Sequence, residues 1–220
     1  MHNYAFKTLV DDIIELIESL QSTKHNKCVL VGHDWGGIIS WTVAQTRPDL
    51  VDRFIVINAP HMDAGKCRAA ISWRQFFSSW YMFIFNIPFL PELLLRGNDL
   101  AFFNQIIDQF SKDSPDERLQ TAEVYKHYFG QPGGFTSPLN YYRALLRGYG
   151  SGENYPITKV KTKTLIIWGK ADMALVSELV DDSAALCEDV TVRYLEKSNH
   201  FVQMEDPDKV NELISQFLAK

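Results

Sequence analysis

The segment VGHDWGG, residues 31–37, places the acidic residue Asp34 among glycines, directly after an apolar run. Gly32, Gly36 and Gly37 suit a sharp strand-to-helix turn, in which the backbone is strained and neighbouring residues must be small. Such a turn, a nucleophile elbow, presents a reactive side chain at one edge of a sheet. An aspartate that only caps a helix needs none of these glycines, so the pattern favours the elbow. We therefore predict that Asp34 is a nucleophile, kept ionised by the N-terminus of the following helix.

A carboxylate nucleophile is suited to some reactions and not to others. Its attack on an amide or an ester would give an anhydride, and the cleavage of the amide or ester would gain little from such an intermediate. Its attack on a saturated carbon gives an ester intermediate that water can hydrolyse. Asp34 therefore indicates displacement at carbon, either the opening of an epoxide or the expulsion of a halide. The sequence contains no G-x-S-x-G segment, which excludes a serine esterase of this type.

The second step of such a reaction needs a base that activates water and a group that orients the base. His200 lies in the segment SNHF after the apolar run VTVRYLE, and Asp172 lies in WGKAD after the run TLIIWG. Nucleophile, acid and histidine follow one another along the chain in the order used by folds built on this elbow. The other five histidines fit less well, so we predict a triad of Asp34, Asp172 and His200.

The elements that must position these residues alternate between apolar runs and helical patterns. The runs that predict buried strands cover residues 27–33, 52–58, 164–169 and 190–196. Helical patterns cover residues 4–20, 34–49 and 208–220. Short apolar runs that alternate with helices indicate an α/β fold, with a mostly parallel sheet covered by helices on both faces.

A different pattern occupies the middle of the chain, which is helical, aromatic and interrupted by prolines. We expect a helical cap over residues 61–155, inserted into a core formed by residues 1–60 and 156–220. The most apolar stretch, FFSSWYMFIFNIPFL at residues 76–90, is short for a membrane span and contains Asn86. We interpret it as a buried or pocket-lining helix, and we expect no membrane span in this chain.

Composition narrows the classes of partner and cofactor. With 46% hydrophobic residues the chain can fill a core, and its net charge of −5 argues against a nucleic-acid partner. The three cysteines are widely spaced, which predicts a reducing compartment and excludes a disulfide framework. No signal peptide is recognisable, so we expect a cytoplasmic protein. No H-E-x-x-H, P-loop or G-x-G-x-x-G segment occurs, so no metal or organic cofactor is expected.

Taken together, the segments GHDWGG, WGKAD and SNHF resemble the α/β-hydrolase-fold epoxide hydrolases over essentially the whole chain. Two segments of the expected cap extend the resemblance: WYMFIFNIP, which contains Tyr81, and SPLNYYR, which contains Tyr142. In that family two cap tyrosines donate hydrogen bonds to the epoxide oxygen, and the resemblance gives this role to Tyr81 and Tyr142. It also implies a small apolar epoxide, such as an epoxidised fatty acid, and water as the reactants.

One feature of the family is absent. Its members carry an H-G-x-P segment after an early strand, and a backbone N–H of that segment helps to form the oxyanion hole. This chain has no such segment, and by comparison with the family roughly the first four core strands are missing. The backbone N–H of Trp35 is then the predicted oxyanion donor, and hydrolysis of the ester intermediate is expected to be slower by about two to three orders of magnitude.

The same absence leads to two further expectations. The nucleophile strand should be an unpaired sheet edge with uncovered apolar faces. The chain is interpreted as a shortened form of an epoxide hydrolase-like protein, whose full-length form could be membrane-associated through a segment absent here.

Two alternatives stay open from the sequence. A haloalkane dehalogenase shares the aspartate elbow, and Trp35 would hold its halide, but the tyrosine pair argues against it. A non-catalytic module of the same fold would bind a lipid or a partner protein. The absent N-terminal strands favour that module, whereas the complete triad opposes it.

Overall fold

The computed structural model describes residues 2–21, 26–149, 155 and 158–219. Within these residues, four parallel strands form one sheet in the order β1-β2-β3-β4. The strands are β1 (Cys28–His33), β2 (Val51–Ile57), β3 (Lys163–Gly169) and β4 (Val190–Leu195). Each strand lies within one residue of its predicted range, and the α/β class with a parallel sheet is confirmed.

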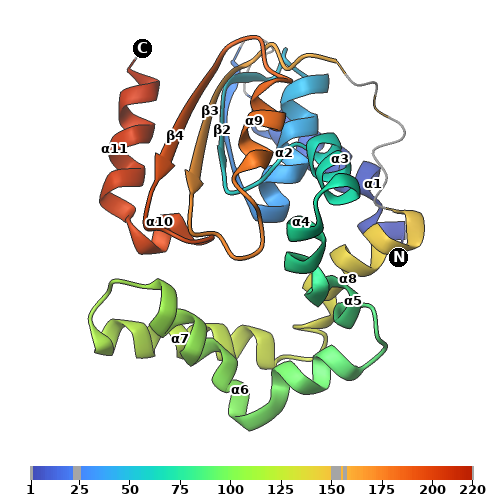
Figure 1. Cartoon of the computed structure of the whole chain (residues 1–220), viewed down its shortest axis with the longest axis vertical. Coiled ribbons are helices and arrows are strands. Elements are labelled where there is room, and N and C mark those ends of the chain that lie inside the picture. Colours follow the sequence, from blue (N-terminus) through green and yellow to red (C-terminus); the bar gives the residue numbers. More distant parts are fainter. Residues whose placement is uncertain (1, 22–25, 150–154, 156–157, 220) are drawn as a thin grey trace.

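One face of the sheet is covered by three helices (Figure 1). They are α1 (Phe6–Leu20), α2 (Asp34–Thr46) and α9 (Glu178–Ala184). Trp41 of α2 and Phe54 of β2 are fully buried and pack edge to face, with ring centroids 4.9 Å apart. The Trp41 indole also donates a hydrogen bond to the Ala59 carbonyl oxygen over 3.0 Å. This contact fixes α2, and therefore the turn at its start, against the sheet.

The opposite face is covered by α10 (Val202–Glu205) and α11 (Pro207–Leu218), beside β3 and β4 (Figure 1). This cover does not extend to β1, where Val29 and Val31 are 44% and 51% exposed. On the other face of β1, Leu30 packs against the cluster formed with α1 and α2. The expectation that the apolar faces of the nucleophile strand are uncovered is therefore confirmed for one face of β1 and wrong for the other.

The described residues from 62 to 149 are helical and contain no strand. They form α3 (Met62–Ile71), α4 (Trp73–Ser78), α5 (Trp80–Phe85), α6 (Leu90–Phe110), α7 (Pro115–Gly130), α8 (Thr136–Ala144) and the π-helix η2 (Leu145–Tyr149). A short 3-10 helix, η1 (His2–Tyr4), precedes α1. The division into a core and a cap stays a prediction, and residue 156, where the core should resume, lies outside the described residues.

The apolar stretch at residues 76–90 differs from the helix that was expected there. It is divided between α4, α5 and the start of α6, with Phe89 in the left-handed region at φ 63°. Tyr81 and Phe85 line a cavity, but Phe77 and Trp80 are 65% and 61% exposed. The prediction of a pocket-lining segment is confirmed, and that of one buried helix is wrong. Among the described residues, no helix has the length and apolar character needed to cross a membrane.

The close approach of α2 to the sheet requires a glycine. A Cβ atom added at Gly37 would lie 2.4 Å from the Ala59 Cβ, and one added at Gly32 would lie 2.7 Å from the Gly37 Cα. A Cβ atom at Gly36, by contrast, would meet nothing within 4 Å. Packing therefore accounts for two of the glycines around Asp34, and Gly36 is free of this constraint.

We expect Gly37→Ala to lower the free energy of unfolding by about 1–3 kcal/mol, because the added methyl group would force α2 away from β2. Gly36→Ala is the matched control. It should stabilise the protein by about 0.5–1 kcal/mol, because alanine loses less backbone freedom in a helix than glycine does. Urea denaturation followed by circular dichroism measures both values. Equal effects of the two substitutions would contradict the packing argument.

Candidate active site

Asp34 occupies the turn between β1 and α2 and has a left-handed backbone conformation, with φ at 50°. A non-glycine residue seldom adopts this conformation, and such strain is concentrated at functional sites. Burial alone would raise the pKa of Asp34. The hydrogen bond and charge of His200, together with the Trp35 backbone N–H, outweigh burial and hold this pKa below its usual value. The carboxylate is therefore ionised at neutral pH, as a nucleophile must be.

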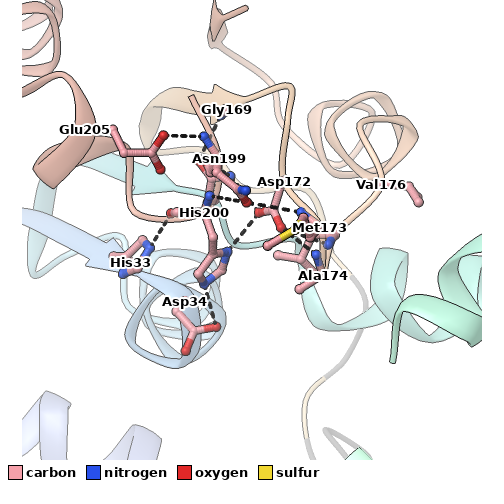
Figure 2. A network of polar contacts seen from close by, with 12 residues as sticks. His33, Asp34, Gly169, Asp172, Met173, Ala174, Val176, Asn199, His200 and Glu205 are labelled. Atoms are coloured by element: carbon pink, nitrogen blue, oxygen red, sulfur yellow. Dashed lines mark hydrogen bonds and ion pairs between the residues drawn. The ribbon is translucent and has the colours of Figure 1, made fainter. Parts of the chain in front are cut away.

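His200 lies between the carboxylates of Asp34 and Asp172 (Figure 2). Its Nδ1 is 2.8 Å from Oδ2 of Asp172, and its Nε2 is 3.4 Å from Oδ1 of Asp34. These residues follow different strands, β1, β3 and β4, whose carboxyl ends meet at one edge of the parallel sheet. The structure thus brings together the three residues that were predicted, on separate loops, as acid, base and nucleophile.

The pKa of His200 reflects a balance of opposing effects. Burial disfavours the charged imidazolium, but hydrogen bonds and charges from Asp172 and Asp34 outweigh it and raise the pKa to about 10. With both carboxylates ionised, His200 is therefore protonated at neutral pH. A protonated imidazole cannot accept a proton, so it can act as a base only after one of its anionic partners has lost its charge.

Asp172 is held by contacts on both of its carboxylate oxygens, and its side chain is fully buried. Oδ1 accepts hydrogen bonds from the backbone N–H groups of Ala174 and Leu175, over 2.8 and 3.0 Å. Oδ2 accepts one from the Asn58 side chain, over 2.7 Å, in addition to its contact with His200. These donors fix the orientation of the carboxylate and stabilise its charge in a buried position.

Asn58 is a site residue that the sequence analysis did not single out. It follows β2 directly, is fully buried, and has a positive φ of 39°. Its amide nitrogen donates to Asp172, and its Oδ1 accepts a hydrogen bond from the Gly169 backbone N–H over 2.9 Å. The sequence did contain one sign of this role: Asn58 stands at the carboxyl end of a predicted strand. Asp172 and His200 were expected at the same edge of the sheet.

A second set of contacts fixes the loop that carries His200 (Figure 2). The Asn199 side-chain oxygen accepts hydrogen bonds from the backbone N–H groups of His200 and Met173, over 2.8 and 3.2 Å. Glu205 in turn accepts a hydrogen bond from the Asn199 N–H over 2.7 Å. The His33 ring nitrogen Nε2 contacts the His200 carbonyl oxygen at 2.9 Å. The last residue of β1 and the loops after β3 and β4 are therefore joined by direct polar contacts.

Tyr81 of α5 and Tyr142 of α8 line the same cavity as Asp34, with their ring centroids 5.8 Å apart. Burial, reinforced by the charge of Asp34, raises the pKa of Tyr81 to about 12. Burial and the charge of Asp34 raise the pKa of Tyr142 further. Both phenols therefore keep their protons and can donate hydrogen bonds into the cavity. Trp35 packs edge-on against Tyr142, with ring centroids 5.3 Å apart.

The cavity has a volume of about 700 Å³ and is bounded by core helices and by helices of the expected cap. Asp34 keeps 39% of its side-chain surface accessible, so it is open to attack a molecule bound in the cavity. Apolar side chains form much of the remaining wall, among them Ile38, Met82, Phe85, Phe110, Leu145 and Leu179. A few polar groups in an apolar cavity of this size are typical of a site for a small molecule.

Among the residues that the structure describes, no group of three or more His, Cys, Asp or Glu side chains could hold a metal ion.

Residues 1–207 match the model of the α/β hydrolase fold family, and the chain belongs to this family. Epoxide hydrolase 1 of Caenorhabditis elegans is 35% identical over 99% of this chain and 54% of its own length. Human epoxide hydrolase 4 is 31% identical over 99% of this chain and 60% of its own length. The chain thus spans little more than half the length of these curated relatives.

Solved structures agree with this assignment of the fold. One is an epoxide hydrolase from Bacillus megaterium, solved in complex with an inhibitor, with a TM-score of 0.82 at 24% identity. The alignment covers 99% of this chain and 77% of the Bacillus megaterium chain. Another is an epoxide hydrolase from metagenomes of hot environments, with a TM-score of 0.76 at 27% identity. The alignment covers 98% of this chain and 74% of the metagenomic chain. The chain is therefore similar to epoxide hydrolases both in sequence and in fold.

The charge of Asp34 contributes to the raised pKa of His200, so removing that charge should lower it. We expect an NMR titration to give a pKa near 10 for His200 in the wild-type protein, and a clearly lower value in Asp34→Asn. Asp52→Asn, which removes an exposed carboxylate on β2, should leave the titration of His200 unchanged. An unchanged His200 titration in Asp34→Asn would contradict the coupling.

Proposed function

We propose that the site catalyses the hydrolysis of an apolar epoxide to a vicinal diol through an ester on Asp34. The observation that carries this proposal is the position of His200 between Asp34 and Asp172, in a cavity that two protonated tyrosines also line. The similarity to enzymes named epoxide hydrolases supports the same reaction.

In the first step, an Asp34 carboxylate oxygen attacks an epoxide carbon, and the bond between that carbon and the epoxide oxygen breaks. Negative charge develops on the departing oxygen. Hydrogen bonds from the Tyr81 and Tyr142 hydroxyls stabilise this charge, and a phenolic proton can pass to the alkoxide. Because the phenols are buried and protonated, they can provide this stabilisation without prior rearrangement of solvent.

The second step depends on the loss of charge at Asp34. Once Asp34 is an ester, it no longer stabilises the His200 imidazolium, so the pKa of His200 falls. The ring then passes its proton, through solvent, to the phenolate left by the first step. Neutral His200, oriented by Asp172, then accepts a proton from water, whose oxygen attacks the Asp34 carboxyl carbon. The Trp35 backbone N–H stabilises the resulting oxyanion. The ester bond then breaks as the departing oxygen takes a proton from the His200 imidazolium, the Asp34 carboxyl returns a proton to His200, and the diol leaves.

The apolar cavity walls support a small apolar epoxide as the substrate, with water as the second reactant. We further propose that residues 61–155 act as a cap, because Tyr81 and Tyr142 reach the cavity from helices within this range. The expected cytoplasmic location and the absence of a nucleic-acid partner stay predictions.

The alternatives are less well supported. A haloalkane dehalogenase has no use for two phenolic donors beside the nucleophile, and the named relatives are epoxide hydrolases. A non-catalytic module has no use for a left-handed aspartate paired with a buried histidine.

The covalent step can be tested directly on this chain. After incubation with an apolar aryl epoxide, mass spectrometry of peptides should find an adduct on Asp34. His200→Gln should accumulate more of the adduct, because it keeps the nucleophile but lacks the base that hydrolyses the ester. Asp34→Asn should form none, and Asp52→Asn should behave as the wild type. Diol formation by wild-type protein with no adduct on Asp34 in either wild type or His200→Gln would contradict the mechanism.

The tyrosines should affect the first step. We expect Tyr81→Phe and Tyr142→Phe each to slow adduct formation about 10²-fold, and the double variant to slow it further, because each loses a donor to the developing alkoxide. Tyr141→Phe is the matched control, since Tyr141 also packs against Trp35, with ring centroids 5.4 Å apart, but does not line the cavity. The rates are measured by quenched-flow mass spectrometry. A similar loss in Tyr141→Phe would indicate an indirect packing effect.

A further inference from the structure

Helices α4 and α5 carry a group of exposed aromatic side chains, which we call the aromatic patch. Its members are Trp73, Phe76, Phe77, Trp80 and Phe83, which are 77%, 44%, 65%, 61% and 53% exposed. Four of these rings contact one another, with centroids 6.3 Å apart for Trp73 and Phe77, 5.8 Å for Phe76 and Phe77, and 6.0 Å for Phe76 and Phe83. A contiguous exposed apolar surface of this kind marks an interaction site.

The aromatic patch is separate from the cavity wall, because other side chains of α4 and α5, and that of the residue between the two helices, form that wall. Gln75, Ser79, Tyr81, Met82 and Phe85 line the cavity. Gln75 is also fixed by hydrogen bonds to the loop after β3, to the Ala174 carbonyl oxygen at 2.9 Å and from the Val176 N–H at 3.0 Å. Helix α4 is thus anchored on its inner side, and both helices present exposed aromatic rings.

Charge around the aromatic patch is unlike that of the whole chain. The chain has a net charge of −5, yet Arg74 is the only charged residue between Trp73 and Pro91. The next acid, Glu92, is neutralised by an ion pair with Arg143 at 2.7 Å. Among the described residues, Arg74 and Lys66 of α3 are exposed and have no ion-pair partner. Arg74, next to Trp73 in α4, therefore adds an unpaired positive charge to the patch, and Lys66 adds a second on the preceding helix.

We propose that the aromatic patch docks the protein on the surface of a phospholipid bilayer, with Lys66 and Arg74 against anionic headgroups. Tryptophan is favoured at the boundary between headgroups and acyl chains, and exposed apolar rings flanked by basic residues bind there peripherally. Each of α4 and α5 has six residues, so neither can span the bilayer. Lys66 also lines the cavity, so the docked surface adjoins the site and gives apolar molecules dissolved in the bilayer a short route to it.

Vesicle binding tests this proposal without any dependence on turnover, so its failure would leave the proposed reaction untouched. Co-sedimentation with phosphatidylcholine vesicles, with and without phosphatidylserine, should show binding that increases with the anionic lipid. Tryptophan emission should shift to shorter wavelength, and brominated acyl chains should quench it, because Trp73 and Trp80 would enter the interface while Trp41 and Trp168 stay buried.

Variants then locate the surface. Replacing Trp73, Phe77 and Trp80 together by serine should lower the partition coefficient at least about tenfold. Replacing Lys66 and Arg74 by glutamine should remove much of the gain from phosphatidylserine, about fivefold for each residue. The matched control replaces Leu119, Val124 and Tyr128 of α7, which are 56%, 55% and 68% exposed, by serine and should bind as the wild type does.

Specific outcomes would overturn the proposal. They are an absence of vesicle binding by the wild-type protein, an equal loss in the α7 control, or a patch-dependent dimer in light scattering that does not bind vesicles. Circular dichroism melts of every variant separate a loss of binding from a loss of folding.

Discussion

The arrangement of the site depends on one electrostatic interaction, that of the His200 imidazolium with two carboxylates. Asp172 contacts one ring nitrogen at 2.8 Å and Asp34 the other at 3.4 Å, so the positive charge is compensated on both sides. In a cavity with apolar walls this compensation is stronger than it would be in water. It keeps Asp34 ionised and His200 protonated at once. The two residues therefore hold each other in the charge states that the proposed attack on carbon requires.

The backbone must keep these charges in place, because the loops that carry them come from different strands. Asn58 binds both Asp172 and the Gly169 N–H, and so joins the end of β2 to the loop after β3. A Cβ atom at Gly169 would lie 2.1 Å from the Asn199 carbonyl oxygen, so the loops after β3 and β4 are also in direct backbone contact. Such close contact leaves the Asp172 and His200 side chains little freedom to separate.

The strands, and the proximity of Asp34, Asp172 and His200, could be predicted from the sequence because each has a local signal. Apolar runs marked the strands, and the parallel sheet then dictates that residues just after them meet at one edge. Asn58 could not be assigned in this way, because its role depends on contacts with residues more than a hundred positions away. The exposure of Phe77 and Trp80 was also beyond prediction, since hydropathy does not show whether an apolar helix meets the core or solvent.

The segment containing α4 and α5 shows why its hydropathy was ambiguous. Its aromatic residues divide between two surfaces, with Tyr81 and Phe85 facing the cavity and Trp73, Phe77 and Trp80 facing outward. A helix with one apolar face would have shown an amphipathic period, but a helix with two apolar faces shows none. Because apolar residues lie on both faces of α4 and α5, the sequence of this segment resembles that of a core helix or a membrane helix.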